Sequence, residues 1–217
     1  ANLLASDSWR DIYLILSLVI SSVVIPLAFF LLKKQKQIQP QAKKIESNQH
    51  IKKVAISGKQ LQFFLGLAGV GCCIAMAMPQ VHIVAYCVGL GYGPTIGAEM
   101  LSLMLACGVI SRITFGVCAD WLGGFYTLIL SSTLQMLSLF LFLPFNGMVS
   151  LYVVSAIFGL SQGGIVPSYT IVVREFLPAH EAGQRIGIVL MLTIFGMAIG
   201  GWMSGWIFDQ SGSYKIA

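Results

Sequence analysis

Arg112 is the residue with the clearest chemical potential in this sequence, because it lies within a long apolar stretch. Asp120 follows it by eight residues, which is about 12 Å along a helix at 1.5 Å per residue. An arginine that deep in a membrane costs several kcal/mol unless it faces a wet cavity or a partner, so it indicates function. Its planar guanidinium suits bidentate binding of a carboxylate. The alternative is an arginine tied to helix-end carbonyls or to Asp120 near the interface.

Two titratable residues lie near the ends of apolar stretches. His82 follows Pro79 by three residues, and an imidazole changes its charge near physiological pH, which makes His82 a candidate for proton coupling. A histidine that is hydrogen-bonded at the interface is an equal alternative. Glu99 begins another apolar stretch. It is either a proton acceptor or an acidic residue that the dipole favours in the first turn of a helix.

Gln162 and Ser161 are polar residues in the middle of a glycine-rich apolar stretch, with Pro167 shortly beyond. Polar groups at membrane depth face the interior of a bundle, and the glycines and the proline permit a bend or a break. Gln162 therefore either lines a substrate path or hydrogen-bonds to a neighbouring helix. Tyr86 and Tyr169 are candidates for the same cavity, although aromatic residues near an interface are also membrane anchors.

The residue types do not indicate an enzyme. The sequence contains no nucleophile–base set and no cofactor motif, and its five cysteines lack the paired spacing of a zinc site. We therefore predict no catalytic residue, no cofactor and no metal, and we interpret the cysteines as small packing residues. They are Cys72, Cys73, Cys87, Cys107 and Cys118.

Composition indicates that these residues are carried by membrane helices. Of the 217 residues, 57% are hydrophobic and only 10% are charged, whereas about 25% are charged in soluble domains. A bilayer core needs about 20 apolar residues in a helix. Continuous apolar runs also argue against a β-barrel, whose strands alternate. We predict an all-α membrane protein with six transmembrane helices, at approximately 12–32, 61–86, 97–119, 124–143, 148–173 and 186–208.

The basic residues predict an orientation. The net charge is +5, and most of the lysines lie in one polar segment, residues 33–59. No aromatic residues interleave with them to stack on bases, so we expect no nucleic-acid partner. A basic segment between apolar spans is typical of a cytoplasmic loop. We therefore predict that loops 33–59, 120–124 and 174–185 are cytoplasmic, and that the chain crosses a bacterial inner membrane or a plasma membrane several times.

The loop after the third predicted span resembles the signature loop of the major facilitator superfamily, G-x-x-x-D-R-x-G-R. Residues 116–124 read GVCADWLGG, which supplies Gly116, Asp120 and Gly123 but has Trp121 and Gly124 where the family has basic residues. Glycine allows a tight turn there, and the aspartate can cap a helix start. Other segments resemble the family's monocarboxylate-transporter-like branch. They are residues 79–84, 111–116, 158–164, 196–205 and 208–214.

This resemblance implies helices six to eleven of a twelve-helix transporter. Residues 1–32 would be the last helix of the N-terminal half, 33–59 the central cytoplasmic loop, and 60–217 the C-terminal half without its final helix. The two ends agree with a repeated architecture, because residues 6–10 (SDSWR) and 211–215 (SGSYK) both read Ser-x-Ser-aromatic-basic. We therefore expect a fragment, and its partners would include the missing half of the same transporter as well as lipid.

The function that the resemblance implies is secondary transport by alternating access about a midplane site. It assigns Arg112 to the carboxylate of a small, monocarboxylate-like organic anion, with His82, Gln162 and Tyr86 completing the cavity and proton symport as an option. Residues 187–208 contain no lysine or arginine, which favours a single negative charge over a dicarboxylate. The alternatives are a superfamily transporter of a drug or sugar, and a self-sufficient six-helix channel or scaffold.

Overall fold

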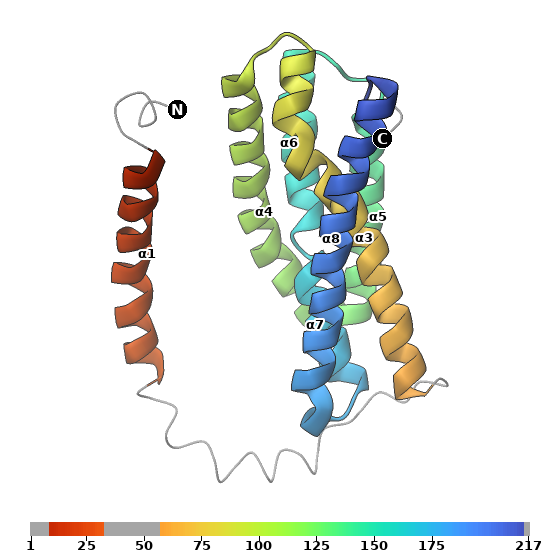
Figure 1. Ribbon diagram of the computed structural model, residues 1–217. Coiled ribbons are helices and arrows are strands. Elements are labelled where there is room, and N and C mark those ends of the chain that lie inside the picture. Colours follow the sequence, from red (N-terminus) through yellow and green to blue (C-terminus); the bar gives the residue numbers. More distant parts are fainter. Residues whose placement is uncertain (1–8, 33–56, 215–217) are drawn as a thin grey trace. The chain divides into compact units, whose positions relative to one another are not determined.

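The described part of the chain is helical. The computed structural model describes residues 9–32 and 57–214, and within these ranges it contains no strand. Six stretches in them are long and apolar enough to cross a membrane, which confirms the predicted all-α class and its six spans. The chain divides into two units, one holding α1 and the other holding α3 to α8 (Figure 1). Each unit is described by itself.

The helices match the predicted spans to within a few residues at most ends. Their bounds are α1 Trp9–Leu32, α3 Gly58–Gly89, α4 Pro94–Leu122, α5 Gly124–Leu141, α6 Met148–Gln162, α7 Ile165–Phe176 and α8 Ala182–Ser211, with a short 3-10 helix at Ala179–Glu181. α3 begins within the predicted loop 33–59 because Ser57 caps it. The Ser57 hydroxyl accepts from the Gln60 N–H at 3.4 Å, and Gln60 Oε1 accepts from the Ser57 N–H at 3.1 Å. Residues 33–56 of that loop lie outside the described residues.

The first unit contains the apolar helix α1, with Pro26 in its interior. Large side chains such as Leu18 and Phe29 are exposed around it. The hydroxyls of Ser17 and Ser22 donate within the helix, each to a carbonyl three residues earlier, at 2.8 Å. Because these polar groups are satisfied locally, the helix meets the requirement for a segment surrounded by lipid or by other apolar helices.

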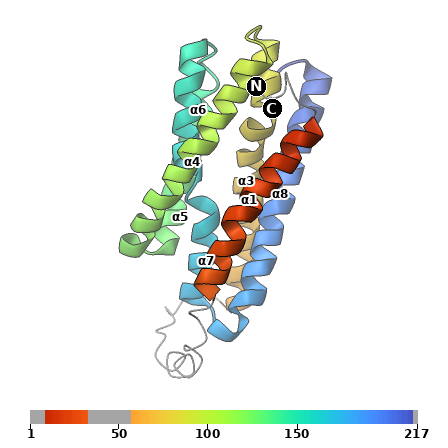
Figure 2. The ribbon, with the colours of Figure 1, turned by 90° about the vertical axis from the view of Figure 1, so that its left-hand side faces the viewer.

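The second unit is a bundle of five membrane spans. α3 packs mainly against α8, α4 packs against α6, and α5 packs against both α6 and α7. Figure 2 shows α6 and α7 following one another along the bundle, so that these two helices together form one span. Apolar side chains gain little from leaving lipid for a bundle, so close packing and hydrogen bonds must hold these helices together.

Glycines Gly196 and Gly200 bring α8 against α3. A Cβ placed on Gly196 would lie 2.6 Å from the carbonyl oxygen of Val70, and one on Gly200 would lie 2.7 Å from the Cα of Ile74. Nonbonded carbon atoms prefer about 3.5–4.0 Å, so neither position has room for a side chain. The two glycines, four residues apart on α8, thus form a small-x-x-x-small contact with α3.

The fifth predicted span is broken in its middle. α6 ends at Gln162 and α7 begins at Ile165, with Gly163 and Gly164 between them. A Cβ on Gly163 would lie 2.6 Å from the carbonyl oxygen of Gly108 on α4. The break therefore lies where the backbones of two spans meet, in agreement with the predicted bend or break.

Hydrogen bonds between buried side chains supplement this packing. The hydroxyls of Ser138 on α5 and Ser161 on α6 lie 3.1 Å apart. Nε2 of Gln135 on α5 donates to the carbonyl of Cys72 on α3 at 3.0 Å. Ser138, Ser161 and Gln135 are all nearly inaccessible. Interhelical hydrogen bonds of this kind stabilise membrane bundles by about 0.6–2 kcal/mol each.

Candidate functional site

Arg112 lies on an exposed side of α4, beside the contact between α4 and α6. Its neighbour Ser111 is fully buried and donates its hydroxyl to the carbonyl of Leu160 on α6 at 2.5 Å. Arg112 itself is exposed, and it has no hydrogen bond or ion pair to any residue of 9–32 or 57–214. Neither Asp120 nor a helix-end carbonyl holds it there. Its guanidinium is therefore accessible to a ligand in this unit.

Gln162, the last residue of α6, is hydrogen-bonded to α3 and lies near α4. Its Oε1 accepts from Nε2 of Gln80 on α3 at 2.6 Å. A Cβ placed on Gly108 of α4 would lie 3.9 Å from Gln162 Nε2, so the amide also lies close to that helix. Of the two predicted roles, the hydrogen bond to a neighbouring helix is present. A contact between Gln162 and a substrate stays a prediction.

His82 connects α3 to α8 and to the segment that follows α8. Nε2 lies 2.8 Å from the carbonyl oxygen of Gly201, and Nδ1 lies 3.1 Å from the hydroxyl of Tyr214. A carbonyl only accepts, so Nε2 carries the proton and Nδ1 accepts from the tyrosine hydroxyl when the ring is neutral. This is the hydrogen-bonded histidine that was one of the two predicted alternatives.

Tyr214 is held in place from two sides. Its ring stacks on Phe208, with centroids 4.2 Å apart and an interplanar angle of 17°. Partial burial, together with the negative charge of Asp209, raises the pKa of Tyr214. Its hydroxyl therefore keeps the proton that it donates to His82 across the physiological pH range.

Tyr86 belongs to a cluster at the same end of the bundle. Its hydroxyl donates to Asn146 Oδ1 at 2.8 Å, while the hydroxyl of Tyr92 donates to the backbone carbonyl of Asn146 at 2.9 Å. Tyr86 also meets the ring of Tyr214 edge-on, with centroids 6.0 Å apart. Tyr86 is thus engaged in fixing the loop between α5 and α6.

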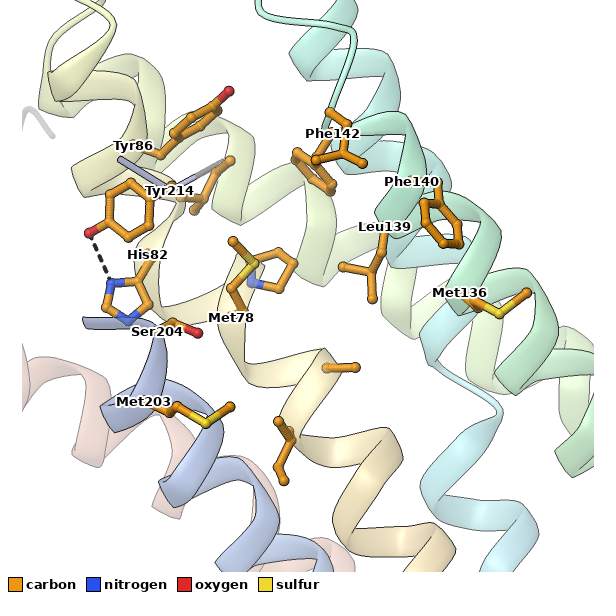
Figure 3. Close-up of a pocket in the computed structure, with 15 residues that line it drawn as sticks. Met78, His82, Tyr86, Met136, Leu139, Phe140, Phe142, Met203, Ser204 and Tyr214 are labelled. Atoms are coloured by element: carbon orange, nitrogen blue, oxygen red, sulfur yellow. Dashed lines mark hydrogen bonds between the residues drawn. The ribbon is translucent and has the colours of Figure 1, made fainter. Parts of the chain in front are cut away.

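A cavity of about 420 Å³ lies between α3, α5 and α8, next to His82 and Tyr86 (Figure 3). Tyr214 closes part of it and points its hydroxyl at His82. Its wall is mostly apolar and contains no lysine or arginine, so it offers an anion no permanent positive charge. The other labelled side chains around it are Met78, Met136, Leu139, Phe140, Phe142, Met203 and Ser204.

The four predicted substrate-binding residues therefore lie in two places. His82 and Tyr86 line the apolar cavity, whereas Arg112 and Gln162 do not. Arg112 and Gln162 instead lie close to the contact between α4 and α6. Electrostatics favours this second place for an anion, because the guanidinium charge is there.

The signature loop between α4 and α5 is a tight turn that α7 holds. Gly123 has φ 83° and ψ 162°, a conformation that is essentially restricted to glycine. The N–H of Gly124, the first residue of α5, donates to Glu175 Oε1 at 2.9 Å. The sequence suggested Asp120 for capping, but Asp120 lies within α4 and Glu175 provides the capping carboxylate. This correction arises because the partner comes from a helix that is distant in sequence.

Alanine substitutions at Gly123 and Gly116 test whether the backbone conformation of Gly123 requires glycine. We expect Gly123→Ala to lower the free energy of unfolding by about 1–3 kcal/mol, because alanine is strained at that φ and ψ. Gly116→Ala is the matched control, since Gly116 lies within α4 and a Cβ there would meet nothing within 4 Å. Thermal unfolding in detergent measures both variants, and equal losses at the two positions would contradict the assignment.

Several residues of these networks were missed in the sequence. Gln80 satisfies the criterion that identified Gln162, a polar side chain within an apolar span, and could have been found. Asn146 and Tyr214 lie outside the helices and carried no comparable signal. Within residues 9–32 and 57–214, no group of three or more histidine, cysteine or acidic residues could hold a metal, and the five cysteines are free thiols.

Comparison with known proteins supports the resemblance seen in the motifs. The sequence profile of the Major Facilitator Superfamily matches residues 1–201. Monocarboxylate transporter 13 of Rattus norvegicus is 29% identical over 142 residues, covering 64% of this chain and 33% of the relative. Monocarboxylate transporter 10 of Danio rerio is 28% identical over 150 residues, covering 64% of this chain and 28% of the relative.

A third relative, the MFS-type transporter opdF of Penicillium oxalicum, is 27% identical over 120 residues, covering 55% of this chain and 28% of the relative. The chain thus spans about a third of the length of the curated relatives that it matches. No solved structure matches it significantly. The profile match and the six apolar spans indicate a multi-pass membrane protein. The chain belongs to the major facilitator superfamily.

Proposed function

We propose that this chain is part of a secondary transporter that moves a small organic anion with one carboxylate. The observation that carries this proposal is Arg112, an exposed arginine within a membrane span that has no acidic partner in the described residues. A buried charge in lipid is costly, so such a residue is retained for a pathway or a ligand. Its forked guanidinium binds a carboxylate through two parallel hydrogen bonds.

The number of available cations supports a substrate with a single negative charge. Residues 187–208 of α8 contain no lysine or arginine. Lys59, Arg174 and Arg185 lie at or near helix ends, and Arg185 already pairs with Glu181 at 2.5 Å. One guanidinium can neutralise one carboxylate. A second carboxylate in the same site would face the desolvation cost of an unpaired charge.

The proposed mechanism is alternating access, in which two halves of the transporter rock about a site near the bilayer midplane. In this mechanism the exposed side of α4 that carries Arg112 lines the path between the halves. Residues 1–32 belong to the first half and 60–217 to the second. The basic segment 33–59 connects them on the cytoplasmic side, where loops 120–124 and 174–185 also lie.

Counterflow into liposomes that contain the complete protein tests the substrate class. Vesicles are loaded with an unlabelled monocarboxylate, and uptake of the labelled compound is compared with that of its neutral amide and of a dicarboxylate of similar length. We expect uptake of the monocarboxylate alone. Equal uptake of the amide would contradict the role of the substrate's negative charge. Preferred uptake of the dicarboxylate would contradict a site in which Arg112 alone binds one carboxylate.

Proton symport is the further part of the proposal, with His82 as the titrating group. Protonation would turn Nδ1 from an acceptor into a donor, and the hydroxyl of Tyr214 would then have to accept from it and redirect its own proton. The contacts of His82 with Gly201 and Tyr214 would thereby depend on pH. Protonation of His82 would therefore change the contacts between α3, α8 and the segment after α8.

Replacing His82 with glutamine tests this coupling. Glutamine can donate to Gly201 and accept from Tyr214, but it does not titrate. We expect the variant to fold and to transport, with an uptake rate that no longer depends on pH. The measurement is initial uptake at fixed concentration of the anionic substrate. A pH profile identical to that of the unmodified protein would rule out His82 as the coupling group.

A further inference from the structure

The amides of Gln80 and Gln162 use only part of their hydrogen-bonding capacity. Each amide has a carbonyl oxygen that accepts and an NH₂ group that donates twice. The two side chains share one hydrogen bond, from Gln80 Nε2 to Gln162 Oε1 at 2.6 Å. Gln80 Oε1 and Gln162 Nε2 have no partner in the described part of the chain. The pair therefore presents one unused carbonyl oxygen and one unused NH₂ group, besides the second N–H of Gln80 Nε2.

This result does not depend on how the amides are oriented. The oxygen and nitrogen of a glutamine amide can exchange places by a flip of the group. If both amides flip, Gln162 donates to Gln80, and the free groups become the NH₂ of Gln80 and the oxygen of Gln162. In either orientation the pair offers one NH₂ group and one carbonyl oxygen.

The free atoms of the pair are not completely enclosed. Within the described ranges, the buried side-chain atoms without a partner are Gln135 Oε1, Ser155 Oγ and Tyr169 Oη, and the free atoms of Gln80 and Gln162 are not among them. Gln80 is half-buried, whereas Gln162 is only 6% exposed. A purely structural hydrogen bond between two helices does not require accessible donors and acceptors. A ligand can reach the pair from the side of Gln80, the less buried of the two residues.

The pair lies close to Arg112. Gln162 Nε2 approaches Gly108 of α4, where a Cβ would be 3.9 Å away, and Gly108 is one helical turn from Arg112, about 6 Å along the axis. Side chains on a helix tilt toward its N-terminus. This tilt would bring the side chain of Arg112 toward the level of Gly108. A small molecule with its carboxylate on Arg112 would extend toward the two amides.

We propose that the Gln80–Gln162 pair is a specificity-determining element that binds a hydroxyl group of the transported carboxylate. A hydroxyl both donates and accepts, so it matches a pair that offers one acceptor and one donor. A ketone can only accept, an ammonium group can only donate, and a methyl group can do neither. This inference rests on the proposed function, because it places the carboxylate of the same substrate on Arg112.

The test compares a hydroxylated monocarboxylate with its analogue that lacks the hydroxyl. Counterflow of 2-hydroxybutyrate and of butyrate is measured at one pH in liposomes that contain the complete protein, and uptake into protein-free liposomes is subtracted. The readout is the ratio of the two kcat/KM values. Gln80→Met and Gln162→Met remove the amides at nearly constant size. Gln135→Met is the matched control, a glutamine in an interhelical hydrogen bond whose free oxygen is buried.

We expect the unmodified protein to prefer the hydroxylated substrate by about tenfold or more, because sites built for a hydroxyl reject analogues that lack it. Either methionine variant at 80 or 162 should bring the ratio of the two kcat/KM values close to one. The Gln135 variant should keep the original ratio. If one of the two variants fails to reach the membrane, the ratio measured for the other variant decides the test.

Two results would overturn the inference while leaving the proposed function intact. One is an unmodified protein that takes up both monocarboxylates equally well. The other is a preference for the hydroxylated compound that survives in the variants at 80 and 162. Failure of the proposed function looks different, because neither monocarboxylate would then be taken up by the unmodified protein.

Discussion

Replacing Arg112 with glutamine is expected to lower kcat/KM for carboxylate uptake by about 100-fold. Loss of one partner of a buried charge pair costs about 2–5 kcal/mol, and each 1.36 kcal/mol corresponds to a factor of ten. Arg112 has no acidic partner among the described residues. Its removal therefore leaves no protein charge unpaired in that part of the structure. The lower kcat/KM should then reflect the lost interaction with the substrate carboxylate.

A lysine at position 112 should recover part of the activity. Lysine supplies the positive charge but not the planar fork of donors that binds both carboxylate oxygens. We expect uptake between that of the glutamine variant and that of the unmodified protein, mainly through a higher KM. Graded loss from arginine to lysine to glutamine would identify a charge that contacts the substrate.

The matched control is Arg174→Gln. Arg174 is exposed in the last turn of α7, away from the middle of the span, and we expect uptake within about twofold of the unmodified protein. All variants are compared at equal amounts of protein in the liposome membrane. Uptake by Arg112→Gln at the level of Arg174→Gln would disprove the carboxylate assignment.

Replacing Gly200 with leucine is expected to prevent correct assembly of the bundle. A Cβ on Gly200 already lies 2.7 Å from the Cα of Ile74, so a leucine would have to push α8 away from α3. Overpacking of a core costs about 1–3 kcal/mol, and this site should reach at least the upper end because the obstacle is backbone, which cannot change rotamer. We expect little monodisperse protein in detergent and a clearly lower thermal midpoint in what remains.

Gly71→Leu on α3 is the control for this substitution. A Cβ on Gly71 would meet nothing within 4 Å, so a leucine there adds the same volume without a clash. We expect its yield and thermal midpoint to stay near those of the unmodified protein. If Gly71→Leu and Gly200→Leu were equally harmful, the loss would come from leucine in a membrane helix and not from the contact between α3 and α8.

The sequence by itself determined the class of the protein and its spans. A bilayer imposes one length on every apolar helix, and this length can be read from local composition. The glycines around Gln162 marked the break in the fifth span, which lies at Gly163 and Gly164. These signals are local. A glycine lacks a side chain, so it allows a bend or a close backbone contact in any helix bundle.

The tertiary structure decided which polar residues meet. His82 pairs with Tyr214 and Gly201, and Gln162 pairs with Gln80, over separations of more than 80 residues. Glu175 and not Asp120 caps α5. Sequence spacing gives the face of a helix on which a residue lies but not the neighbour that covers that face. For this reason the four residues that the sequence grouped into one site lie in two places, and Arg112, the residue with the clearest chemical potential, is the one that the described structure leaves free.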